Sequence, residues 1–163
     1  KPVVVAVNGV AAGAGANLAL AGDVVLAAQS AKFIQAFSKI GLIPDTGGTL
    51  TLPRLAGFAK ASAWMMLAES ISAEEAERHG LIYRVVADEA LADEAMAVAQ
   101  KLAAMPTEAL ALTKEALNAT IFHGFAEQLA LERALQNRAG ATADFAEGVA
   151  AFLEKRQPQF RGQ

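Results

Sequence analysis

The segment from residue 2 to residue 28 constrains the fold most, because it joins two β-branched runs through a glycine-rich turn and a short helical pattern. Residues 2–7 predict a strand, residues 14–21 a short helix ended by Gly22, and residues 24–28 a second strand. Strands joined through a helix usually lie parallel, with a right-handed crossover. We therefore expect an α/β fold built on a mainly parallel sheet.

The composition changes along the chain. Up to about residue 52, β-branched runs alternate with glycine turns, whereas Ala, Leu and Glu at helical spacing dominate after residue 58. We expect a sheet-bearing region over residues 1–87 and a helical region over 88–163. Further helices are predicted over 46–52 (stopped by Pro53), 58–68, 88–104, 107–122, 125–139 and 143–154, with a strand over 81–86. Ser72 and Glu75 predict a capping box for a helix that ends at Gly80.

Charge and cysteine content exclude several classes of protein. The net charge is −3, with 14 basic against 17 acidic residues and no basic block among aromatics, so we expect no nucleic-acid partner. The absence of cysteine excludes disulfides, thiolate catalysis and cysteine-bound zinc, and it fits a cytoplasmic location. No apolar run reaches the roughly 18 residues that span a bilayer, so no membrane partner is expected.

Two further features concern partners and completeness. Hydrophobic residues make up 54% of the chain, which predicts that some apolar surface meets a partner. The sequence runs straight from Lys1 into a strand-like segment, so we expect this chain to be the C-terminal portion of something longer. No metal-ligand spacing is present, and His79 and His123 both precede a glycine at a predicted helix end, where they would satisfy terminal carbonyls.

A glycine cluster at residues 9–15 follows the first strand and opens the first helix. The amides of Gly13, Ala14 and Gly15 would point out of a helix N-terminus, which favours negative charge. A dinucleotide site fails on spacing, because Leu18 stands where the third glycine should be. No Gly-Lys-Ser/Thr follows, so a phosphate-binding loop of the P-loop type is excluded as well. An oxyanion hole and a plain tight turn remain as interpretations.

Asp45 is the one acidic group in an apolar, glycine-rich stretch over residues 40–49. It could be the N-cap of the helix that follows. Alternatively, Phe37, Leu42 and Ile43 could form an apolar wall whose burial disfavours the charged carboxylate, as a base near neutral pH requires. A carboxylate facing bare amides suits removal of a proton next to a carbonyl, with the enolate oxygen held by the amides.

These motifs resemble the crotonase (enoyl-CoA hydratase/isomerase) superfamily. The resemblance rests on residues 1–9, 12–15 and 40–49, on Asp23, and on the closing residues 152–156 with Phe160, so that it covers essentially the whole chain. It implies a crotonase fold with a C-terminal helical trimerisation region and its N-terminal part missing. Residues 36–45 are similar to the superfamily's branch of phenylacetyl-CoA ring-epoxide isomerases.

The resemblance also implies a mechanism. The two glutamates with which hydratases of the family activate water match Asn17 and Phe37, neither of which can take a proton, whereas several isomerases carry aspartate at Asp45. This favours an acyl-CoA isomerase with one catalytic carboxylate. The expected reaction is ring-epoxide to oxepin isomerisation, and the alternative is 3,2-enoyl-CoA isomerisation. Hydration, aryl-CoA dehalogenation and non-catalytic CoA binding are further alternatives.

By the same resemblance, the Ala14 amide is one of two oxyanion-hole donors, with Gly13 and Gly15 shaping its turn. The other donor would precede the first strand. Asn17, Phe37, Leu42 and Ile43 would line the substrate pocket. Phe152 and Lys155 would lie near the adenosine end of CoA, although a solvated helix end is an equal reading of Lys155. The implied assembly is a homotrimer or a hexamer, with no metal and no cofactor beyond the CoA of the substrate.

Overall fold

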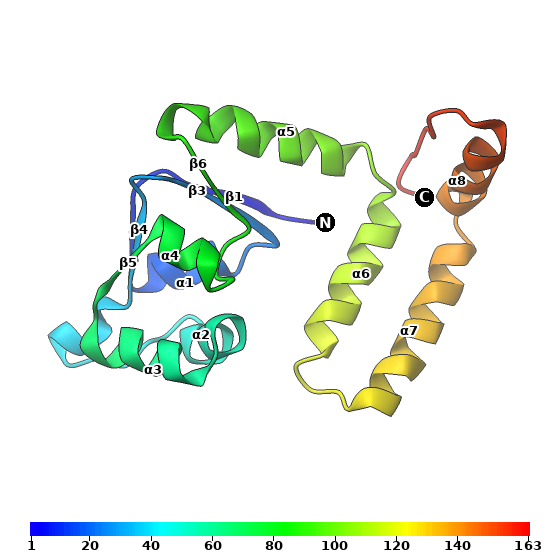
Figure 1. The fold of residues 1–163 in the computed structure, drawn as a ribbon. Helices are drawn as coiled ribbons and strands as arrows, with labels where there is room; N and C mark the ends of the chain where they lie inside the picture. The colour runs from blue at the N-terminus through cyan, green and yellow to red at the C-terminus, as the bar shows by residue number, and fades with distance from the viewer. The chain divides into compact units, whose positions relative to one another are not determined.

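The computed structural model describes residues 1–163 and divides the chain into two compact units (Figure 1). The sheet-bearing unit comprises Val3–Val98, and the helical unit comprises Ala99–Gln163 together with Lys1–Pro2. The division falls within α5 (Leu91–Ala103), later than the boundary at residue 87 that composition suggests. The two units are described separately below.

The first sheet contains three parallel strands in the order β1–β3–β6. These are β1 (Val4–Val7), β3 (Val24–Ala28) and β6 (Arg84–Val86). Val4 pairs with Val24, and Leu26 pairs with Arg84. The predicted strand, turn, helix and strand of the first 28 residues are confirmed, and so is the parallel pairing.

A second sheet contains β2 (Val10–Ala12), β4 (Lys32–Ile34) and β5 (Ser70–Ser72) in the order β2–β4–β5. The β2–β4 pair is parallel and the β4–β5 pair antiparallel. The strands of this second sheet are not among the predicted elements, whereas the predicted mainly parallel sheet is the first one. Each strand of the second sheet has three residues and forms through pairing with distant segments, as between Phe33 and Ile71. Local propensity carries little information about such strands.

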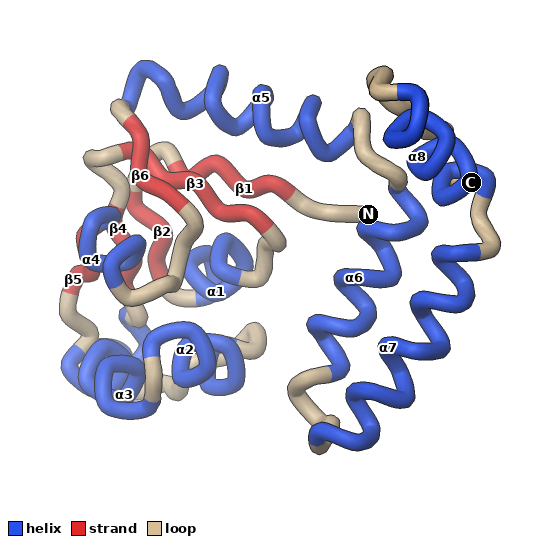
Figure 2. The backbone as a smooth tube through the Cα atoms, turned by 45° about the vertical axis from the view of Figure 1, so that its right-hand side comes forward, coloured by secondary structure: helices blue, strands red, loops and turns tan.

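Eight α-helices and two short 3₁₀ helices complete the chain (Figure 2). In the sheet-bearing unit they are α1 (Ala14–Leu20), η1 (Ala36–Ile40), α2 (Gly48–Ala56), α3 (Phe58–Leu67), α4 (Ala73–Arg78) and η2 (Asp88–Ala90), followed by α5. The helical unit contains α6 (Thr107–Ala119), α7 (Phe125–Gly140) and α8 (Ala143–Glu154). None of these helices combines the length and the apolar character that crossing a bilayer requires.

Two details of the predicted helix ends are wrong. Pro53 lies inside α2 and does not stop it. The helix begins later than predicted, at Gly48, and continues to Ala56. The Ser72 hydroxyl accepts from the Glu75 amide at 3.1 Å, which is half of the predicted capping box. The Glu75 carboxylate instead accepts from the Lys60 ammonium at 3.2 Å, so the ion pair replaces the reciprocal cap bond.

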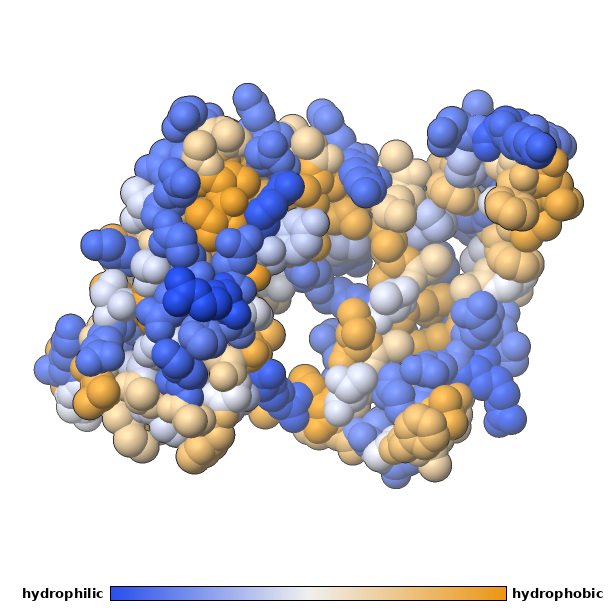
Figure 3. All heavy atoms as spheres, viewed as in Figure 1, coloured by the Kyte–Doolittle hydropathy of each residue, from blue (hydrophilic) through white to orange (hydrophobic).

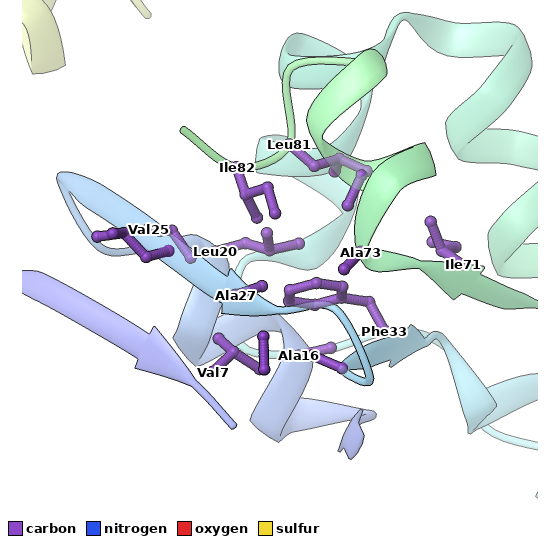
Figure 4. Packing of buried hydrophobic residues seen from close by; sticks show 14 of the residues in the cluster. Val7, Ala16, Leu20, Val25, Ala27, Phe33, Ile71, Ala73, Leu81 and Ile82 are labelled. Atoms are coloured by element: carbon purple, nitrogen blue, oxygen red, sulfur yellow. The ribbon is translucent and has the colours of Figure 1, made fainter. Parts of the chain in front are cut away.

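The core of the sheet-bearing unit lies between the strands and helices α1, α3 and α4. Figure 4 shows the Phe33 ring among Ala16, Ala27 and Ala73, where the small side chains leave room for it. Full burial of a side chain of this size contributes roughly 1.5–3 kcal/mol. Trp64 is also buried, with its ring edge-on to His79 at 5.7 Å between centroids. His79 caps the end of α4, as predicted.

In the helical unit, α6 and α7 lie side by side (Figures 1 and 2). The chain after α8 folds back onto that helix through two acidic side chains. The buried Asp144 carboxylate accepts from the amides of Arg161 and Gly162, both at 2.7 Å. Glu147 accepts from the Gln159 amide at 2.8 Å and from the Arg156 guanidinium. These bonds fix the C-terminal segment against α8.

The attachment through Glu147 should weaken in acid. Hydrogen bonds from Arg156, and then from the Gln159 amide, lower the pKa of Glu147 from 4.5 to about 2. A lowered carboxyl pKa stabilises the folded state fully above the unfolded value, and this contribution is lost as the pH falls from 4.5 towards 2. We expect hydrogen exchange at the Gln159 amide, corrected for its intrinsic pH dependence, to accelerate over that interval. A Glu147→Gln variant should lack the transition, and its persistence there would contradict this assignment.

Candidate active site

Asp45 lies in a strained turn between η1 and α2. Thr46 and Gly47 both adopt left-handed backbone conformations, with φ of 52° and 77°. This conformation is unfavourable for a β-branched residue such as threonine. The Thr46 hydroxyl donates to the Asp45 carboxylate at 2.7 Å, and the Gly48 amide donates to the Asp45 carbonyl at 2.9 Å. Gly47 is the N-cap of α2, so the reading of Asp45 as the N-cap is wrong.

The Asp45 side chain is exposed within residues 1–163. Phe37 is buried as expected, but Leu42 and Ile43 are 59% and 81% exposed. The apolar wall around the carboxylate is therefore not formed within this chain. The physical reason is local: Gly41, the C-cap of η1, has a left-handed φ of 74° that redirects the backbone, and the following residues run over the surface.

Asn17 connects α1 to the Asp45 turn. Its side chain is buried, and its amide nitrogen donates to the Asp45 main-chain carbonyl at 2.8 Å. Its amide oxygen accepts from Gln35 Nε2, also at 2.8 Å. Asn17 was predicted to line the pocket, but both of its polar side-chain atoms form hydrogen bonds within the protein. In doing so it fixes the catalytic candidate beside the glycine-rich helix start.

The start of α1 presents free amides. Gly13 adopts φ 55° and ψ −126°, and its amide donates to the Ile34 carbonyl at 2.8 Å. A side chain there would be strained by the positive φ, and its Cβ would lie 3.6 Å from the Phe37 ring. The amides of Ala14 and Gly15 have no hydrogen-bond partner in the chain. They can therefore donate hydrogen bonds to an anionic oxygen from outside the chain.

The sheet-bearing unit therefore joins Asp45 to α1, the helix that carries Ala14 in its first turn. Phe152 and Lys155 belong to the helical unit, where Phe152 is 83% exposed and Lys155 is the left-handed C-cap of α8. No group of three or more His, Asp or Glu side chains is placed to hold a metal ion.

Two residues of the site were not predicted from the sequence. Gln35 and Thr46 contact Asn17 and Asp45 directly. A signal for Gln35 exists, because Phe33, Gln35 and Phe37 are buried at a spacing of two, which makes Gln35 the polar member of an inward-facing row. Thr46 carries no comparable signal, since its left-handed conformation follows from the turn as a whole.

Comparison with curated proteins gives consistent relatives. The chain is 56% identical over 163 residues to 1,2-epoxyphenylacetyl-CoA isomerase of Escherichia coli K12, and the match covers 100% of this chain and 62% of that protein. It is 55% identical to a "Probable enoyl-CoA hydratase" of Rhodobacter capsulatus, over 99% of this chain and 63% of the relative. It is 39% identical to trans-2-decenoyl-[acyl-carrier-protein] isomerase of Streptococcus mutans, over 100% of this chain and 62% of the relative. The chain thus spans less than two thirds of each relative.

Solved structures agree in fold. An enoyl-CoA hydratase from Bacillus anthracis superposes with a TM-score of 0.96 at 37% identity, over 100% of this chain and 63% of that one. An enoyl-CoA hydratase from Polaromonas sp. JS666 superposes with a TM-score of 0.95 at 43% identity, over 99% of this chain and 63% of that one. The arrangement of helices and sheets is therefore the crotonase fold. The family model for enoyl-CoA hydratase/isomerase matches residues 1–163, and the chain belongs to that family.

Proposed function

We propose that this chain carries the proton-transfer site of an acyl-CoA isomerase. The observation that carries the proposal is the division of roles between Asp45 and Asn17. Asp45 presents an exposed carboxylate, while Asn17 is buried with its amide engaged by main chain and by Gln35. One group can exchange a proton with a ligand and the other cannot. Asp45 would take a proton from the carbon next to the thioester carbonyl and return it to another carbon.

The Ala14 amide would hold the enolate oxygen formed in that step. It has no partner in the chain, and it lies in the first turn of the helix that Asn17 ties to the Asp45 turn. Gly13 and Gly15 shape this turn, Gly13 through its positive φ. A preorganised main-chain donor stabilises developing charge at little reorganisation cost.

Hydration is the less favoured reaction at this site. It needs two carboxylates to place and activate water, at the positions that resemblance assigns to Asn17 and Phe37. Phe37 is apolar and its ring lies against Gly13, while both polar atoms of Asn17 are hydrogen-bonded. Neither side chain can bind and deprotonate a water molecule.

We propose the phenylacetyl-CoA ring epoxide as substrate, with its oxepin isomer as product. The 56% identity to 1,2-epoxyphenylacetyl-CoA isomerase supports this choice. Isomerisation of a 3-enoyl-CoA to a 2-enoyl-CoA is the alternative, and the 39% identity to a decenoyl isomerase is compatible with it. Leu42 and Ile43, both exposed beside Asp45 in sequence, would line the acyl pocket.

The helical unit would mediate assembly and contact CoA. Apolar side chains reach its surface at the α6–α7 connection and on α8, as Figure 3 shows; they are Phe122, Phe125, Phe152 and Leu153. Exposed apolar patches of this kind mark interaction sites. We propose a homotrimer or a dimer of trimers, with Phe152 and Lys155 near the adenosine end of CoA and no further cofactor.

Product analysis tests the proposed reaction. The protein expressed from its complete reading frame is incubated separately with the ring epoxide and with a 3-enoyl-CoA, and the products are identified by mass and by their spectra. We expect each product to have the same mass as its substrate. We also expect a higher kcat/KM for the ring epoxide than for the 3-enoyl-CoA. A hydroxyacyl-CoA heavier by one water would overturn the proposal, and faster turnover of the 3-enoyl-CoA would favour the alternative substrate.

A further inference from the structure

A chain of two buried side-chain amides ends on the main chain of Asp45. Gln35 Nε2 donates to Asn17 Oδ1 at 2.8 Å, and Asn17 Nδ2 donates to the Asp45 carbonyl at 2.8 Å. Gln35 and Asn17 are 0% and 1% exposed. The three residues come from different segments: the connection after β4, helix α1, and the turn before α2. The pair therefore joins three segments at one point.

The direction of this chain is fixed by its last acceptor. A carbonyl oxygen can only accept, so Asn17 must turn its nitrogen to Asp45 and its oxygen to Gln35. Gln35 must then present its nitrogen. A carboxylate in place of either amide would break this order, because it offers no donor when ionised.

The turn that the pair holds is strained and closely seated. Thr46 and Gly47 both have positive φ. A Cβ on Gly48 would lie 2.3 Å from Asn17 Nδ2, so the backbone at the start of α2 rests directly on the asparagine amide. Strained backbone persists only where its surroundings hold it in place. Asn17 supplies such a contact on the same carbonyl that accepts from the Gly48 amide.

Fold stability alone does not account for Gln35. Its Oε1 is buried and has no hydrogen-bond partner. An unsatisfied buried acceptor destabilises a protein, and an apolar residue of the same shape avoids that penalty. A side chain with an unfavourable term for stability is expected where function requires it.

We propose that Asn17 and Gln35 are positioning residues that hold the Asp45 carboxylate in register with the Ala14 amide, by way of the Asp45 main-chain carbonyl. The inference rests on the proposed function, because it assigns Asp45 the proton transfer. It gives Asn17 a role other than pocket lining. Neither amide touches the substrate; both act through the turn.

The test compares Gln35→Met, the apolar double variant Asn17→Leu with Gln35→Met, and a control, all in the protein expressed from its complete reading frame. Gln35→Met removes the donor to Asn17 together with the unsatisfied oxygen. We expect its Tm to be unchanged or higher, with kcat lower by about 10- to 100-fold and KM nearly unchanged, because misplacing a catalytic group by about 1 Å can cost 10²-fold. The double variant should show at least the same loss of kcat.

Gln128→Met is the matched control. Gln128 also donates its side-chain amide to a main-chain carbonyl, that of Ala116, but it lies in the helical unit. Its kcat should equal that of the unaltered protein. If this control loses kcat as Gln35→Met does, a general effect of amide removal would explain both, and the positioning role would be overturned.

Asn17→Asp supplies a readout that is independent of packing. When it is protonated, the introduced carboxyl can donate a hydrogen bond to the Asp45 carbonyl. When it is ionised, the carboxylate has no proton to donate and repels the carbonyl oxygen. We expect the kcat of this variant, relative to the unaltered protein and corrected for folded fraction, to fall with rising pH between about pH 5 and pH 8, since burial raises a carboxyl pKa. A ratio that is independent of pH would count against the assignment.

Failure of this inference is distinguishable from failure of the proposed function. If Asp45→Asn loses activity while Gln35→Met and the double variant retain full kcat, the positioning role is wrong and the catalytic role of Asp45 stands. If Asp45→Asn retains activity, the proposed function itself is wrong, whatever the amide variants do.

Discussion

Replacing Asp45 with asparagine should lower kcat by about 10²- to 10⁴-fold, the range typical of losing a general acid or base. The amide cannot take up a proton, yet its oxygen can still accept from the Thr46 hydroxyl that now bonds the carboxylate at 2.7 Å. The turn should therefore survive. The measurement is steady-state turnover of both candidate substrates, together with deuterium uptake into the product from heavy water.

Asp93→Asn is the matched control for this substitution. Asp93 is an exposed carboxylate of the same unit, in the first turn of α5. The Asp93→Asn substitution removes the same charge without changing the Asp45 turn, so the turnover of this variant should equal that of the unaltered protein. Undiminished turnover and deuterium uptake in Asp45→Asn would refute the role given to Asp45.

Ala14→Pro should reduce kcat/KM by about 10²- to 10³-fold, the usual effect of deleting one oxyanion-hole donor. Proline has no amide hydrogen, so the substitution removes the proposed donor itself. Ala14 is the first residue of α1, where proline is well tolerated and where the amide has no partner in the chain to lose. The effect should therefore fall on catalysis and leave the helix in place.

Ala14→Gly separates the amide from the side chain. Glycine keeps the donor and removes only a methyl group, so its kcat/KM should stay within a few-fold of the unaltered protein. Circular dichroism of both variants checks that the fold is retained. Equal losses of kcat/KM in the proline and glycine variants would show that the amide hydrogen is not the group that matters.

The elements with strong local signals could be predicted from the sequence. β3 has the predicted bounds, Val24–Ala28, and α8 spans Ala143–Glu154 as predicted. β3 is a continuous apolar run between polar residues, and α8 has apolar residues at helical spacing. Thr142 also caps α8 by accepting from the Phe145 amide. The second sheet could not be predicted, because its three-residue strands depend on partners far away in the sequence.

The candidate site also has features that could be predicted from the sequence and features that could not. Residue type alone indicated that Asp45 can exchange a proton and that Asn17 and Phe37 cannot. The apolar wall that could bury the Asp45 carboxylate is not found, because exposure depends on which elements cover a loop and not on its own apolar residues. The amide pair of Asn17 and Gln35 could not be predicted either, since it forms only where three segments meet.

The distribution of chromophores between the two units has a practical consequence. Trp64, buried edge-on to His79, is the only tryptophan, and Tyr83 is the only tyrosine; both belong to Val3–Val98. Fluorescence from tryptophan and tyrosine therefore monitors unfolding of the sheet-bearing unit and does not report on α6, α7 and α8. Far-ultraviolet dichroism registers both. Recording the two signals in one denaturant titration would reveal whether the units melt together or in sequence, with no label attached.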